Sequence, residues 1–287
     1  MKSLLVPIDF SEQSIHAFRF ALDIAKQSNG TVHMLHVISL PVLQESPLMP
    51  VPDLRRDLVE ESRISAESKF NEIIREFNTR AIRIETHTAP GRIPATILDF
   101  IEKYKIDLVV MGTKGAAGIK EWMIGSNTEK IVRTSPVPLI AIKYYTPSPS
   151  FKNIVFPTTL DSENQEPLVM KIKALQDFFQ ATLHLIWVNT PALTTPDSEA
   201  RKKLNAFAQR FMLKDFTINV FKYTNEEAGI LEFTSQLNGD LIALGTRGLT
   251  GISHLLNGSI AEDVVNHVRF PVWTYCTKSA NRLALPK

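Results

Sequence analysis

Short, continuous runs of apolar residues alternate with longer amphipathic segments along the first half of the chain. The apolar runs predict strands at residues 3–8, 31–38, 107–111 and 137–142, and the alternation of Ile82, Ile84 and Thr86 predicts another at 82–88. Between them, apolar residues recur at helical intervals and predict helices at about 12–28, 53–78, 93–104 and 126–134. Buried strands that alternate with helices are typical of a parallel sheet covered on both faces.

The second half repeats this order, with strands expected at residues 153–157, 182–188, 216–222, 240–244 and 271–275. Ten positions of the segment 111–138 are identical to positions 133 residues further on, and four of the ten are glycines. The segment 146–150 carries alternating prolines, which cannot continue a strand or a helix, and is interpreted as a linker. The sequence therefore predicts two domains of one α/β fold, at residues 1–145 and 151–278.

Composition narrows the class of protein. The chain has 287 residues, of which 44% are hydrophobic and 22% charged, as in an ordinary globular protein. A net charge of +2 gives no bulk attraction to nucleic acid or to an anionic membrane. The single cysteine, Cys276, cannot form an internal disulfide, and no apolar run has the length of a signal peptide core or a membrane span. We expect a soluble, cytoplasmic protein.

A glycine-rich loop follows the fourth strand of each half, with the form G-x-x-G, nine residues, then G-S. The loop residues are Gly112, Gly115, Gly125 and Ser126 in the first half and Gly245, Gly248, Gly258 and Ser259 in the second. Glycines let a backbone approach an anion, and the Gly-Ser pair opens a helix whose free N–H groups favour a phosphate. Further hydroxyls and cations come from Thr113, Lys114, Thr246 and Arg247. The spacing is neither a Walker A motif nor a dinucleotide fingerprint. Tight turns alone would also use such glycines.

Three features of the first half together resemble the universal stress protein family. They are the run Pro7-Ile8-Asp9-Phe10-Ser11, the His36-Val37 end of the second strand, and the glycine loop from Met111 to Ser126. The resemblance covers nearly the whole chain, as a tandem member of the ATP-binding branch. It implies two five-stranded parallel α/β sandwich domains, similar to the adenine nucleotide alpha hydrolases, which form a pseudo-dimer within one chain through their last strands.

The resemblance also implies a site for ATP, ADP or AMP, with or without Mg²⁺. Asp9, two residues after Pro7, would lie near the ribose and phosphates, and the backbone of Val37 would hold the adenine. Met111 and Gly112 would line the ribose side. The phosphates would be held by Gly115, Gly125, Ser126 and Asn127.

The second half departs from this pattern. Alignment of the first strands of the two halves puts Thr159 where the first half has Asp9. Ile260 stands where the first half has Asn127. Val188 takes the adenine-side position, and the phosphate loop is intact. We therefore expect the first half to bind nucleotide more readily than the second.

The leading hypothesis is an ATP-binding stress-response regulator or sensor without strong catalysis. Its expected partners are adenine nucleotide, unidentified proteins and a second copy of the chain, but not nucleic acid or membrane. One alternative is a slow ATPase or a nucleotide-dependent transferase, although no base for water is evident beyond Asp9. Another is an interaction scaffold whose loops bind nothing.

No metal site is expected from the sequence. His33 and His36 are three residues apart on a predicted strand, so their side chains face opposite sides and cannot share a metal ion. Each is interpreted as a core or edge histidine. Cys276, on or just after the last strand, is interpreted as a buried bystander and not as a reactive thiol.

Overall fold

The computed structural model describes residues 1–39, 51–77, 79, 81–113, 125–147, 151–158, 165–192, 194–246, 264 and 270–277. The elements of the first half are β1 (Ser3–Pro7), α1 (Glu12–Ser28), β2 (Thr31–Ile38), α2 (Val51–Glu76), β3 (Arg83–Pro90), α3 (Ile93–Lys103), β4 (Leu108–Gly112), α4 (Ser126–Thr134) and β5 (Leu139–Ile142). Those of the second half are β6 (Asn153–Pro157), α5 (Glu166–Phe179), β7 (Thr182–Asn189), α6 (Asp197–Arg210), β8 (Phe216–Lys222), α7 (Glu226–Leu237), β9 (Leu241–Thr246) and β10 (Val272–Cys276).

The predicted alternation of strands and helices is confirmed, with shifts of one or two residues at several element ends. Helix α2 begins at Val51, so Pro52, which was expected in the preceding loop, lies in its first turn. A proline is tolerated there because the N–H it lacks has no partner within the helix. Strand β5 begins two residues later than the predicted Val137. The Ser135 hydroxyl bonds to both the N–H and the carbonyl of Val137, at 3.3 and 2.7 Å, which holds that residue in a turn.

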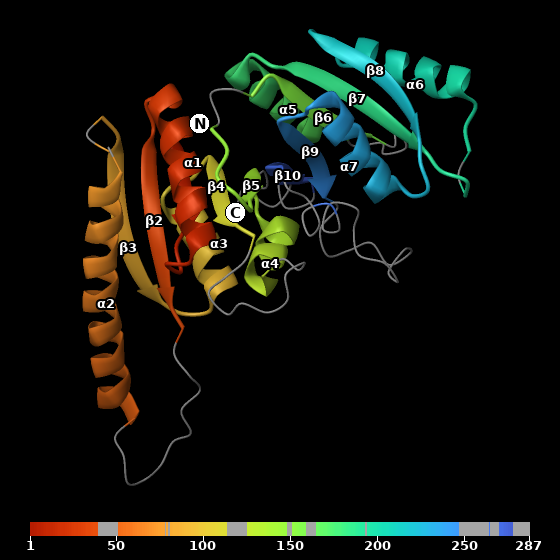
Figure 1. Cartoon of the computed structure of the whole chain (residues 1–287). Coiled ribbons are helices and arrows are strands. Elements are labelled where there is room, and N and C mark those ends of the chain that lie inside the picture. Colours follow the sequence, from red (N-terminus) through yellow and green to blue (C-terminus); the bar gives the residue numbers. More distant parts are fainter. Residues whose placement is uncertain are drawn as a thin grey trace, which may run out of the picture.

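The ten strands form one sheet, in the order β3-β2-β1-β4-β5-β10-β9-β6-β7-β8 (Figure 1). All described pairings within a half are parallel. The halves join through an antiparallel pairing of β5 with β10, in which Ile140 lies opposite Trp273. The order of strands reads the same from either edge. This arrangement confirms the expected pseudo-dimer within one chain.

Helices cover both faces of the sheet. Helices α1, α2, α5 and α6 bury apolar side chains on one face, and α3, α4 and α7 do so on the other. Each large aliphatic or aromatic side chain that is fully buried contributes about 1.5–3 kcal/mol to stability. Both apolar clusters include residues from both halves, so the halves share a core on each face of the sheet. Among the described helices, none has the length and apolar character needed to cross a membrane.

The start and the end of α1 follow two signals in the sequence, Ser11 as a predicted N-cap and Asn29-Gly30 as a predicted stop. Ser11 is the N-cap, and its hydroxyl accepts a hydrogen bond from the N–H of Ser14 at 3.3 Å. Asn29 ends the helix in the left-handed conformation, at φ 51°, which asparagine tolerates better than most residues. The helix therefore begins immediately after the turn that carries Asp9.

Candidate functional site

A cleft opens in the first half at the carboxyl ends of β1 and β4. These strands are neighbours in the sheet, although the chain passes through β2 and β3 between them. Such a switch point is where ligands bind in open α/β sheets. The space between the walls is about 590 Å³, counting the solvent at its mouth. The cleft is lined by Pro7, Ile8, Asp9, Ser14, Leu35, His36, Val37, Ile93, Met111, Gly112, Gly125, Asn127 and Thr128.

The turn after β1 presents Asp9 at the cleft. One carboxylate oxygen of Asp9 accepts hydrogen bonds from the Ser11 N–H at 3.1 Å and the Ser11 hydroxyl at 2.5 Å. Between them, Phe10 has a φ of 64°, an unusual conformation for an aromatic residue. Strain of this kind costs about 1–3 kcal/mol and persists only where neighbouring contacts enforce it. The turn holds the Asp9 carboxylate on the exposed side of the cleft.

Packing of Phe10 enforces this turn. Its ring lies 4.7 Å from the ring of His36 and 5.4 Å from that of Phe70 in α2, measured between centroids. The Nδ1 atom of His36 lies 2.8 Å from the carbonyl oxygen of Ile8. Because a carbonyl can only accept a hydrogen bond, Nδ1 carries the proton. His36 thus ties the end of β2 to the turn that carries Asp9.

The opposite wall combines a close helix contact with an open helix N-terminus. A Cβ atom on Gly112 would lie 2.7 Å from the Gln13 carbonyl carbon, so only glycine allows α1 to lie this close to β4. The N–H of Gly125 donates to the carbonyl of Thr113 at 2.7 Å, and the Thr128 hydroxyl donates to that of Gly112 at 3.0 Å. These bonds anchor the start of α4 to the end of β4.

Gly125 is the N-cap of α4, and no side chain of the described residues accepts a hydrogen bond at this cap. The first N–H groups of a helix have no partner within the helix, and they carry partial positive charge. Gly125, Asn127 and Thr128 all line the cleft. The start of α4 is therefore a ready position for an anionic group.

Apart from Val188 and Gly245 of the second half, the sequence-predicted site residues fall into three groups. Seven of them line the cleft, namely Pro7, Asp9, Val37, Met111, Gly112, Gly125 and Asn127. Ser126 is exposed at the start of α4, and Thr113 is buried with no hydrogen-bond partner for its hydroxyl among the described residues. Lys114, Gly115, Arg247, Gly248, Gly258 and Ser259 lie outside the described residues.

Six lining residues were not predicted as ligand contacts from the sequence, namely Ile8, Ser14, Leu35, His36, Ile93 and Thr128. Ile8 and His36 stand next to predicted residues in the chain, so a wider reading of each motif would have included them. Ser14 and Ile93 come from α1 and α3, whose distances from the glycine loop are set by packing.

The matching position of the second half is packed differently. A Cβ on Gly245 would meet a methyl carbon of Leu168 at 2.5 Å. Leu168 is the third residue of α5, and Ser14 is the third residue of α1. Val188, expected on the adenine side, packs against Gly229 of α7, where an added Cβ would approach it to 2.6 Å. The Thr246 hydroxyl donates to the carbonyl of Val132 at 3.3 Å.

A second depression in this half lies elsewhere, beyond the ends of β7 and β8. Its lining residues are Asn189, Thr190, Pro191, Thr194, Lys222, Tyr223 and Thr224. The predicted residues Val188 and Gly245 are not among them. Cys276, on β10, is buried, and its thiol donates to the carbonyl of Arg133 at 3.3 Å, which fits a bystander.

Comparison with known proteins places this fold and cleft in a family. The model of the universal stress protein family matches twice, over residues 1–143 and 150–275. The chain belongs to the universal stress protein family. It is 29% identical over 143 residues to the universal stress protein MJ0531 of Methanocaldococcus jannaschii, which is 50% of this chain and 82% of that protein. YxiE of Bacillus subtilis is 27% identical over 144 residues, 49% of this chain and 97% of that protein.

The tandem arrangement is also found in a solved structure. The universal stress protein of Archaeoglobus fulgidus matches 96% of this chain over 98% of its own, with a TM-score of 0.73 and 20% identity. At 20% sequence identity, this structural similarity is evidence for the fold alone. The predicted family and the predicted tandem α/β fold are therefore both confirmed for this universal stress protein.

Proposed function

We propose that the first half of this universal stress protein binds an adenine nucleotide in the cleft between β1 and β4, and that the protein acts as a nucleotide-dependent regulator or sensor in a stress response. The observation that carries the proposal is the start of α4, which has no side-chain cap among the described residues and lines one cleft together with the turn that holds Asp9. An uncapped helix N-terminus favours a phosphate group.

The other lining residues suit the rest of a nucleotide. Leu35, Val37 and Met111 give an apolar wall for a base, with the buried backbone end of β2 beside it. Asp9 is the acidic residue among the described lining residues, and its carboxylate can accept a hydrogen bond from a ribose hydroxyl. A carboxylate is also the kind of group that holds Mg²⁺ carried by phosphates.

The second half is proposed to bind nucleotide more weakly or not at all. Leu168 brings a bulky apolar side chain to Gly245, at the same helix position where the first half has the small, polar Ser14. The proposed role of the second half is structural: it contributes strands to the common sheet and apolar side chains to the core. Because β5 already pairs with β10, a homodimer of the whole chain would need a different surface.

The test is identification of the nucleotide released by acid from the purified chain, with titrations of Mg·ATP, ADP, AMP and cAMP into nucleotide-free protein. We expect one adenine nucleotide per chain and a rise in melting temperature on titration, since ligand that binds only the folded state stabilises it. A chain that releases no nucleotide, and whose melting temperature none of the four ligands raises, contradicts the proposal.

The variant Gly125→Asp locates the site. Gly125 has φ −61° and ψ 136°, which any residue adopts, and an aspartate there would cap α4 with about 1 kcal/mol of stabilisation. The aspartate carboxylate would accept hydrogen bonds from the N–H groups of the first turn of α4 and would repel a phosphate group. We therefore expect at least a tenfold loss of nucleotide affinity, about 1.4 kcal/mol. Asn225→Asp at the cap of α7 is the matched control, expected to leave affinity unchanged. Equal affinities in the two variants would place the nucleotide elsewhere.

A further inference from the structure

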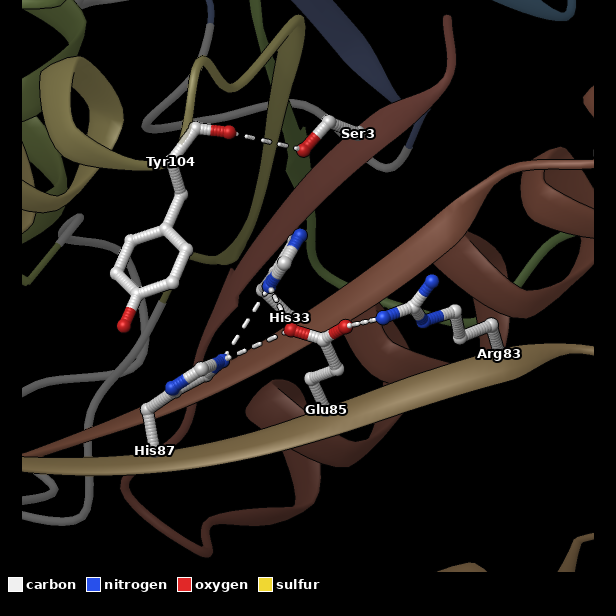
Figure 2. A network of polar contacts seen from close by, with 6 residues as sticks. All are labelled: Ser3, His33, Arg83, Glu85, His87 and Tyr104. Carbon is white, nitrogen blue, oxygen red and sulfur yellow. Dashed lines mark hydrogen bonds and ion pairs between the residues drawn. The ribbon is translucent and has the colours of Figure 1, made fainter.

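Three potential metal ligands meet on β2 and β3, on the face of the sheet covered by α3. His33 of β2 lies directly opposite Glu85 of β3, and His87 is two residues further along β3. Residues two apart on a strand share a face, so Glu85 and His87 both reach toward His33. Figure 2 shows the three side chains pointing toward one another.

The distances within this cluster match those of a tetrahedral metal site. His33 Nδ1 lies 3.3 Å from His87 Nε2 and 3.4 Å from Glu85 Oε2, and the latter two atoms are 3.9 Å apart. Ligand bonds of about 2.0–2.1 Å at tetrahedral angles put neighbouring ligand atoms about 3.3 Å apart. The two distances from His33 Nδ1 already have about this value. A shift of about half an ångström would bring Glu85 Oε2 and His87 Nε2 to the same separation.

The surroundings of the two imidazoles are largely buried and favour their neutral form. The His33 side chain is 8% exposed and that of His87 18%, and both rings pack against Phe100 and Tyr104 of α3. Burial lowers the pKa of both histidines, with Glu85 acting in the opposite direction. Neutral imidazoles with an available lone pair are the ligands that metal ions require.

Neighbouring charges orient the carboxylate. The exposed Arg83 pairs with Oε1 of Glu85 at 2.7 Å, so Oε2 is the oxygen that faces the imidazoles. Arg83 lowers the pKa of His33, and Lys103 of α3 lowers that of His87. A hydrogen-bonded partner behind a ligand fixes its orientation, as is usual for metal sites.

The second half provides a metal-free counterpart. His184 takes the position of His33, but Thr217 and Asn219 stand where β3 has Glu85 and His87. Both ring nitrogens of His184 have polar partners, the Thr217 hydroxyl at 2.8 Å and the Asn153 side-chain oxygen at 3.1 Å. A histidine here therefore needs no carboxylate or second histidine for the fold. The second half therefore lacks two of the three ligands at the matching positions.

We propose that His33, Glu85 and His87 form a binding site for a divalent transition metal, with Zn²⁺ the best match and the fourth position open to water. Two imidazoles and one carboxylate are a ligand set that zinc accepts, and the tetrahedral spacing favours zinc over magnesium or calcium, which prefer more numerous oxygen ligands. The site is distinct from the nucleotide cleft, whose described lining residues include none of the three ligands.

The test is equilibrium dialysis and calorimetry of the full chain, stripped of metal and nucleotide, with Zn²⁺ alone. We expect one Zn²⁺ per chain and, with Co²⁺, the visible absorption of a four-coordinate site. Glu85→Gln and His87→Gln change partly buried side chains on an edge strand, and each should weaken Zn²⁺ binding at least tenfold because it removes one ligand. His184→Gln is the matched control and should bind as the unaltered chain does.

Zn²⁺ affinity that is the same in Glu85→Gln, His87→Gln and the unaltered chain would overturn the proposal, as would a chain that binds no Zn²⁺. Circular dichroism of each variant shows whether a loss of binding reflects a loss of fold. Gly125→Asp, which addresses the nucleotide cleft, should bind Zn²⁺ normally, so failure of one proposal can be told from failure of the other.

Discussion

The two halves of this universal stress protein have the same order of strands but different contacts at the β–α switch point. In the first half, the backbone of α1 lies directly on Gly112, and Ser14 borders an open cleft. In the second, the side chain of Leu168 stands between α5 and Gly245. The connection from strand to helix is also longer there, residues 158–165 against 8–11. Repetition of the glycine pattern therefore preserves the strand end without preserving the helix contact beside it.

The two halves also differ at β2 and β7, the strands next to β1 and β6. His33 and His184 occupy matching places on β2 and β7, yet one faces two further ligand groups and the other faces a hydroxyl and an amide. A duplicated residue thus acquires a different role when its neighbours on the edge strand change. The halves serve as internal controls for one another.

The largest expected difference between the halves concerns the two strand-end glycines. Gly112→Ala would put a Cβ within 2.7 Å of the backbone of α1, which cannot move aside without shifting the helix. We expect a loss of about 1–3 kcal/mol in the free energy of unfolding, as for overpacked sites. In Gly245→Ala the added Cβ meets only the end of the flexible Leu168 side chain, so the loss should be smaller. Urea denaturation of both variants measures this, and equal losses would refute the proposed difference in helix approach.

Transfer of the metal ligands would test the comparison at the edge strands. The double variant Thr217→Glu and Asn219→His places beside His184 the two side chains that accompany His33. We expect the Zn²⁺ stoichiometry to rise from one to two per chain, with the new site the weaker because no arginine is matched to the introduced carboxylate. Equilibrium dialysis gives the count. A stoichiometry that stays at one would mean that these two side chains are not sufficient for the site.

A smaller effect is expected in the pH dependence of stability. Burial lowers the pKa of His33, His87 and His184 in the folded chain. The unfolded chain, with histidine pKa values of about 6.5, takes up protons first as the pH falls. Stability is therefore fully present above about pH 6.5 and is lost as the pH drops toward the lower folded-state pKa values.

Melting temperatures of the metal-free chain between about pH 7.5 and about pH 5.5 measure this effect. Replacing His33 and His87 together by glutamine should flatten the pH dependence more than His184→Gln does, because two buried groups are removed. Glu85 raises both pKa values of the first-half pair while Arg83 and Lys103 lower them, and these charges remain in the variants. An unchanged slope in the double variant would contradict the assignment of the pH dependence to this cluster.

Much of the fold could be predicted from the sequence because its determinants are local. The apolar runs, the Ser11 cap and the Asn29 stop each act within a few residues, and the offset of 133 is visible without a structure. The cleft was predicted in part, since Asp9 and Gly112 stand at strand ends, and strand ends meet at one edge of a parallel sheet.

The cluster around His33 was missed for an equally physical reason. A search along one strand correctly separates His33 from His36, whose rings contact α3 and Phe10 respectively. Metal ligands, however, are brought together across strands. The i, i+2 spacing of Glu85 and His87 on a predicted strand was the available signal, but only the register of β2 on β3 places them opposite His33.

The sequence by itself determined the elements, their duplication and the family, because these depend on periodicity and on motifs that are read within one segment. Only the tertiary structure decided that β5 pairs with β10, that Leu168 stands over Gly245 while α1 itself lies on Gly112, and that two histidines and a glutamate share one face. Each of these depends on distances between segments far apart in the chain, which are fixed by the packing of side chains and the register of strands.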